Sequence, residues 1–144
     1  MRPRVERLEG AIVDQIAEDR GWIRQLSPAA VDDLRRAVAH AERLGKPYLA
    51  MSPADFPLGA ETRDALREAV AVSLGRWGLC LLKGFPVRAW TEAQTRLAHW
   101  GVGLQVGVAR PQNRNSDILN DVRDEGGESY HVKGGRGYNT RLKL

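Results

Sequence analysis

Residues 75–87 read GRWGLCLLKGFPV, and this stretch decides the predicted fold. Residues 79–83 form a short apolar run that has Gly78 before it and Gly84 after it, which is typical of a buried strand. Phe85 and Pro86 then turn the chain away from the run. We therefore predict a buried strand at residues 79–83.

Two helices are predicted before this strand. The first follows Ser27, which is a good N-cap residue, has Pro28 at its first position and stops at Gly45. The second spans about residues 60–74, where apolar side chains recur at helical spacing. The chain up to residue 76 is therefore expected to be mainly helical.

A third predicted helix follows the strand. Thr91 and Gln94 have the spacing of a capping box, which marks the start of this helix. Gly101 and Gly103 are expected to break it, since glycine is a poor helix former. Residues 77–144 are therefore expected to mix strands with a helix, because strand patterns dominate after these glycines.

The last residues, 138–144, read YNTRLKL and alternate polar and apolar side chains at the period of a strand. Leu142 and Leu144 would share one face of this strand. A strand needs a partner, so we expect the natural protein to continue after residue 144. Such an unpaired edge also predicts self-association or aggregation of the isolated chain.

Composition excludes several classes of protein. The chain is 42% hydrophobic and 28% charged, and no apolar run is long enough to cross a membrane or to form a secretory signal. The single cysteine, Cys80, cannot form an internal disulfide and is expected to be a buried thiol. A cytoplasmic location is therefore expected. The net charge of +4 comes mainly from the tail, so nucleic-acid binding is not favoured.

The residues offer little chemistry of their own. The three histidines are His40, His99 and His131. His40 and His99 lie in predicted helices, where a packed or solvated imidazole is the ordinary role, and His131 lies in a glycine-flanked loop. We therefore predict no metal site and no catalytic residue within these 144 residues.

Taken in order, five segments resemble the N-terminal half of the TauD/TfdA-type dioxygenases. They are residues 75–87, the helix at 91–100, Pro111-Gln112-Asn113, the strand at 119–124 and residues 136–140. The resemblance implies one α+β domain over residues 1–144, with the early helices packed on an incomplete double-stranded β-helix, or jelly-roll, core.

The resemblance also implies a function for the parent protein. Members of this family use Fe(II) and 2-oxoglutarate to oxidise or hydroxylate small organic substrates. Their His-x-Asp, distal His and 2-oxoglutarate-binding Arg would all follow residue 144, so the chain alone is expected to be inactive, and the substrate would bind mainly to that further part. The polar candidates for one wall of the pocket are Gln112, Asn113, Tyr138, Asn139 and Thr140.

An alternative of another class stays open. The basic residues of the tail could contact phosphates, in which case the chain would be a noncatalytic helical binding module, with nucleic acid as the conceivable partner. The residues concerned are Lys133, Arg136, Arg141 and Lys143.

Overall fold

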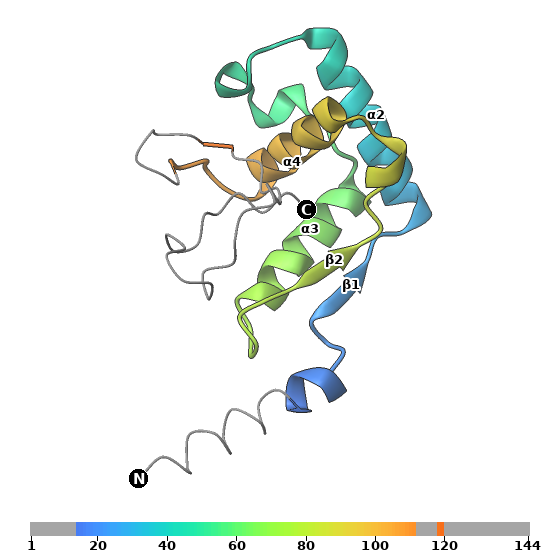
Figure 1. The fold of residues 1–144 in the computed structure, drawn as a ribbon, viewed down its shortest axis with the longest axis vertical. Coiled ribbons are helices and arrows are strands. Elements are labelled where there is room, and N and C mark those ends of the chain that lie inside the picture. The colour runs from blue at the N-terminus through green and yellow to red at the C-terminus, as the bar shows by residue number, and fades with distance from the viewer. Residues whose placement is uncertain (1–13, 112–117, 120–144) are drawn as a thin grey trace, which may run out of the picture. The chain divides into compact units, whose positions relative to one another are not determined.

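The computed structural model describes residues 14–111 and 118–119. The chain divides into two compact units, residues 1–108 and 109–144, and the helices and strands described below all lie in the first unit (Figure 1). In chain order they are β1 (Ile23–Gln25), α2 (Pro28–Leu44), the short 3-10 helices η1 (Tyr48–Ala50) and η2 (Pro53–Asp55), α3 (Ala60–Ser73), β2 (Leu81–Lys83), η3 (Val87–Ala89) and α4 (Glu92–Val106).

Helix α2 forms as the sequence predicts, because both of its ends are capped. The Ser27 hydroxyl accepts a hydrogen bond from the Ala30 N–H at 3.1 Å. Pro28 has no N–H, so the first turn has one donor fewer to satisfy. At the other end Gly45 has a φ of 59°, a left-handed conformation that favours glycine, and its N–H reaches the carbonyls of Ala41 and Glu42. The predicted helix and its stop signal are confirmed.

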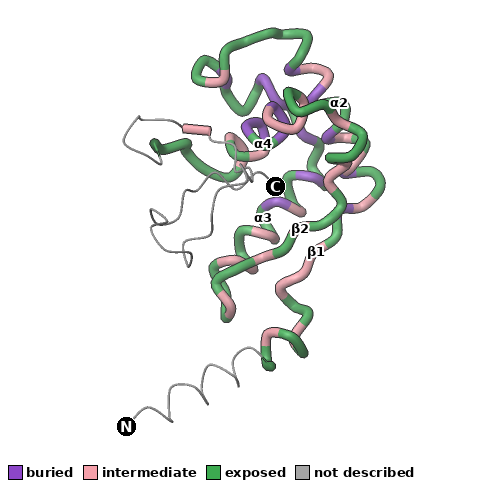
Figure 2. The backbone as a smooth tube through the Cα atoms, viewed as in Figure 1, coloured by how far each residue is buried: buried purple, intermediate pink, exposed green. Residues whose placement is uncertain are grey.

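The core lies among three helices. Helix α2 contacts both α3 and α4, and α3 contacts α4. Leu34 of α2 and Phe56, which follows η2, are fully buried, and Leu66 of α3 and Trp100 of α4 are nearly so. Figure 2 shows that the buried positions gather along the helices and not along the strands. Burial of these apolar side chains is the main stabilising term of the unit.

The two strands pair in parallel, with Ile23 opposite Leu81 and Gln25 opposite Lys83. A parallel pair needs a long crossover, and here α2 and α3 provide it, so that β1 and β2 lie side by side although a long stretch of chain separates them (Figure 1). The sequence analysis predicted no strand at 23–25. Strand β1 has the sequence Ile-Arg-Gln, and three residues are too few to show the period of a strand.

The predicted α+β fold with a jelly-roll core is wrong for the described part of the chain. Its residues are 60% helical and 6% in strands, and the strands form one parallel pair. A jelly roll is built from antiparallel strands in two facing sheets, whereas the crossover through α2 and α3 returns the chain in the same direction. The described residues therefore form a helical unit with a small parallel sheet.

The predicted burial of the strand is also wrong. Leu81 of β2 is 45% exposed and Leu79 before it is 38% exposed, while Cys80 is only partly buried. The reason is that α2, α3 and α4 pack chiefly on one another, so they do not enclose a two-stranded sheet. A short apolar run bounded by glycines therefore predicted the strand correctly but not its environment.

Helix α4 begins at the predicted capping box but does not end at the predicted glycines. The Thr91 hydroxyl accepts from the Gln94 N–H at 3.2 Å and the Gln94 side chain accepts from the Thr91 N–H at 3.0 Å. The helix then continues through Gly101 to Val106. A Cβ atom at Gly101 would overlap the ring of Phe56, so this glycine allows the helix to approach the ring closely.

Alanine substitutions at Gly101 and Gly103 should therefore distinguish the effect of packing against Phe56 from the effect of helix propensity. We expect Gly101→Ala to lower the free energy of unfolding by about 1–3 kcal/mol, because the new methyl group collides with the Phe56 ring. The control is Gly103→Ala, because a Cβ atom there would have no heavy atom within 4 Å. Alanine favours the helix more than glycine does, so this substitution should raise the free energy of unfolding by up to about 1 kcal/mol. Urea unfolding followed by circular dichroism measures both. Equal effects at the two positions would contradict the close approach.

Candidate functional site

The pocket residues that the sequence analysis proposed all lie outside the described residues. They are Gln112, Asn113, Tyr138, Asn139 and Thr140, and they stay predictions. The same holds for the basic tail of the alternative function and for His131. A candidate site can therefore be built only from the helical unit.

The histidines of the helical unit do not form a metal site. His40 is partly buried on α2, whereas His99 is exposed on α4. His40-Ala41-Glu42 matches the His-x-Glu spacing of metal ligands, a match that the sequence analysis overlooked. On a helix, however, residues two apart point in directions about 160° apart, on nearly opposite sides of the axis, so one ion cannot bind both side chains. The Glu42 carboxylate instead accepts a hydrogen bond from Gln94 at 3.1 Å.

No group of three or more His, Cys, Asp or Glu side chains that could hold a metal ion occurs among residues 14–111 and 118–119. These residues therefore do not fit an Fe(II) centre, which needs such a group of ligands.

Within the same residues no helix combines the length and the apolar character that crossing a bilayer requires.

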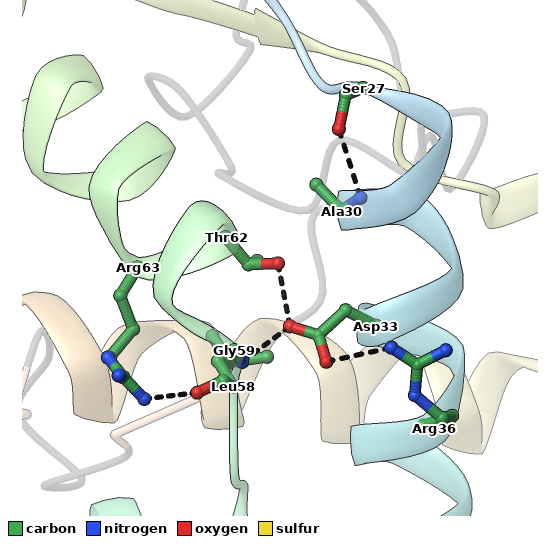
Figure 3. A network of polar contacts seen from close by, with 8 residues as sticks. All are labelled: Ser27, Ala30, Asp33, Arg36, Leu58, Gly59, Thr62 and Arg63. Carbon is green, nitrogen blue, oxygen red and sulfur yellow. Dashed lines mark hydrogen bonds and ion pairs between the residues drawn. The ribbon is translucent and has the colours of Figure 1, made fainter.

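The carboxylate of Asp33 on α2 joins this helix to the start of α3 (Figure 3). Its Oδ2 accepts hydrogen bonds from the Thr62 hydroxyl at 2.6 Å and from the Gly59 N–H at 2.7 Å, and its Oδ1 pairs with Arg36 at 3.2 Å. Gly59 is the N-cap residue of α3 and has no side chain of its own to offer. Asp33 therefore caps α3 from a neighbouring helix.

The environment of Asp33 favours its charged form. Partial burial raises the pKa of the carboxyl, but the hydrogen bonds from Thr62, Gly59 and Arg36 lower it by more, so the pKa lies below its ordinary value of 3.8. A carboxylate held in this way stabilises the fold above its unfolded pKa. We therefore assign Asp33 a structural role.

Asp33→Asn should destabilise the unit, because it removes the negative charge of the carboxylate to which Gly59, Thr62 and Arg36 donate hydrogen bonds. We expect a loss of about 1–2 kcal/mol in urea unfolding at pH 7. The matched control is Asp32→Asn, because among the described residues Asp32 forms only an exposed pair with Arg35. This substitution should change stability by less than about 0.5 kcal/mol.

The effect of Asp33→Asn should also depend on pH. The lowered pKa means that the stabilisation by Asp33 is complete above its unfolded value near 3.8 and is lost as the pH falls through the lower folded value. The difference in stability between wild type and Asp33→Asn should therefore shrink below about pH 4. A difference that stays constant down to pH 2 would contradict the assignment.

A second carboxylate, Asp55 in η2, closes the turn after α2. Lys46 donates to it at 2.6 Å, and the Ser52 N–H and hydroxyl each donate at 2.8 Å. Lys46 and then Ser52 lower the pKa of Asp55 to about 2. Lys46 and Asp55 bind each other within this turn, so we assign the pair a structural role.

Lys46→Met should raise the pKa of Asp55 toward 3.8, while the two Ser52 hydrogen bonds keep it below that value. The stabilisation by Asp55, present above about pH 4, would then disappear at a higher pH during acidification than in the wild type. Side-chain carboxyl chemical shifts measured between pH 1.5 and 6 report the pKa. Arg43→Met, which removes a charge from the last turn of α2, should leave it unchanged.

The cavity described in the helical unit lies between α3 and α4. It has a volume of about 260 Å³. Its lining residues are Arg63, Leu66, Arg67 and Val70 of α3 together with Gln105 and Val106 of α4. The two arginines are one helical turn apart, so they share a face of α3. This cavity is the candidate binding site of the described residues.

The sequence analysis missed this cavity. Arg63 and Arg67 stand four residues apart next to Val70, which is a signal that the sequence contains. Such a pattern is common on solvated helices, however, and the contribution of α4 depends on its packing against α3. Only the folded structure places Gln105 opposite these arginines.

Comparison with known proteins gives a match to part of the chain. This part is similar to FR-33289 synthase of Streptomyces rubellomurinus (strain ATCC 31215), with 35% identity over 68 residues. The match covers 47% of this chain and 20% of that relative, so it concerns about a fifth of the relative's length. No protein-family model matches the chain.

Proposed function

We propose that this chain is the N-terminal part of an oxidoreductase that uses Fe(II) and 2-oxoglutarate to oxidise or hydroxylate a small organic substrate. The observation that carries the proposal is the 35% identity to FR-33289 synthase over 68 residues, which supports an enzyme. The proposed class of enzyme rests on the five segments that, in their order along the chain, resemble TauD/TfdA-type dioxygenases, above all on residues 75–87.

Within this proposal the helical unit supports the active site and does not supply the metal ligands. The described residues do not fit an Fe(II) centre, so we propose that residues outside them bind the metal. The helices α2, α3 and α4 have a core of their own, which allows them to present a rigid surface to the rest of an enzyme.

The proposal is tested with the full product of the gene and with the chain alone as its control. Given Fe(II), 2-oxoglutarate, oxygen and ascorbate, which as the reductant takes the place of the organic substrate, the full product should convert 2-oxoglutarate to succinate and carbon dioxide, and a His-x-Asp pair should be encoded after residue 144. The 144-residue chain should give no stoichiometric charge-transfer band when Fe(II) and 2-oxoglutarate are added without oxygen.

Two outcomes would contradict the proposal. The first is a coding sequence without any His-x-Asp pair downstream, together with no succinate formation. The second is a saturating charge-transfer band in the chain alone that disappears in His99→Ala or His131→Ala, since the metal ligands would then lie within these residues.

A further inference from the structure

The cavity between α3 and α4 combines positive charge with apolar side chains. Leu66, which is 3% exposed, lines it together with Val70 and Val106, which stay 37% and 46% exposed. Arg63 and Arg67 supply two positive charges to the same cavity. A ligand that covers the valines and carries a negative charge would satisfy both features.

The charge of Arg63 is available to a ligand. Its Nη1 donates to the carbonyl of Leu58, a neutral acceptor, which anchors the guanidinium (Figure 3). Arg63 forms no ion pair with any carboxylate among the described residues. The guanidinium has five N–H donors, so several stay free for an oxyanion.

The charge of Arg67 is only weakly engaged. Its Nη1 lies 2.6 Å from Asp64 Oδ1, three residues earlier on α3. The two side chains are 73% and 68% exposed, and exposed pairs of this kind contribute little to stability. A bound anion can therefore share Arg67 at little cost.

Gln105 adds a fixed acceptor. Its Nε2 donates to the carbonyls of Pro53 and Phe56, each at 3.0 Å, which uses both of its N–H groups. The group that remains for a ligand is Oε1, an acceptor. A hydroxyl or amine on the ligand can donate to it.

We propose that this cavity binds a small organic anion: a carboxylate or another oxyanion on a short aliphatic body. The oxyanion contacts Arg63 and Arg67, and the aliphatic body covers Val70 and Val106. The volume of about 260 Å³ is just below the range of about 300–1,000 Å³ usual for drug-sized ligands, which favours a body of a few carbon atoms. This inference does not rest on the proposed enzyme class, because binding needs no metal.

The test is a titration of the ¹⁵N-labelled 144-residue chain with sodium butanoate, followed by amide chemical shifts. We expect saturable shifts at Leu66, Val70 and Val106. Butan-1-ol and butylammonium have the same aliphatic body without the anion, so their dissociation constants should be higher by about tenfold or more.

Substitutions distinguish the cavity from a general effect of charge. Arg63→Gln and Arg67→Gln should each raise the dissociation constant of butanoate by about tenfold. The control is Arg35→Gln, because Arg35 forms the same kind of exposed pair with an aspartate three residues earlier, but on α2 and outside the cavity. It should leave binding unchanged. Circular dichroism of each variant checks that the helices persist.

Any of three results overturns the inference. They are a titration with butanoate that gives no saturable shifts, shifts that lie away from α3 and α4, and a loss of binding in Arg35→Gln as large as that in Arg67→Gln. Arg67→Gln keeps the test decisive even if Arg63→Gln disturbs the anchor at Leu58, since Arg67 has no such anchor within residues 14–111 and 118–119.

Discussion

The packing of the Phe56 ring against Gly101 is the contact on which the helical unit depends. Phe56 is fully buried, and the absence of a side chain at Gly101 allows α4 to lie directly on the ring. The Phe56 carbonyl also accepts a hydrogen bond from Gln105, one turn further along the same helix. An aromatic ring that is buried in this way contributes more apolar area than any aliphatic side chain, so it fixes where α4 lies.

The residues after Phe56 extend this contact to α2 and α3. The carbonyl of Leu58 accepts from Arg63, and the N–H of Gly59 donates to Asp33. The segment 56–59 thus joins the apolar core, the start of α3 and the cavity in four consecutive residues. Together with the Phe56 carbonyl, these backbone groups have partners on three different helices, which is how a short irregular segment avoids unpaired buried groups.

The sequence was sufficient for those features that depend on neighbouring residues. Ser27 with Pro28, Gly45 and the Thr91–Gln94 box predicted the ends of helices correctly, since capping is a local interaction. It was not sufficient for features that depend on distant residues. The exposure of Leu81 and the role of Gly101 follow from how the helices pack. The hydrogen bond of 2.6 Å from Trp77 to Asp19 joins residues 58 positions apart, which precede the paired strands β2 and β1.

The candidate site shows the same division. The charges of Arg63 and Arg67 can be read from the sequence, but their cavity is formed by the packing of α4 against α3. Gln105 and Arg63 are both tied to the segment 56–59, one through the Phe56 carbonyl and the other through the Leu58 carbonyl. Two side chains that line the cavity are therefore positioned by the same segment that fills the core. Any change that displaces the Phe56 ring must shift these two groups as well, so the stability of the helical unit and the geometry of the cavity are physically coupled.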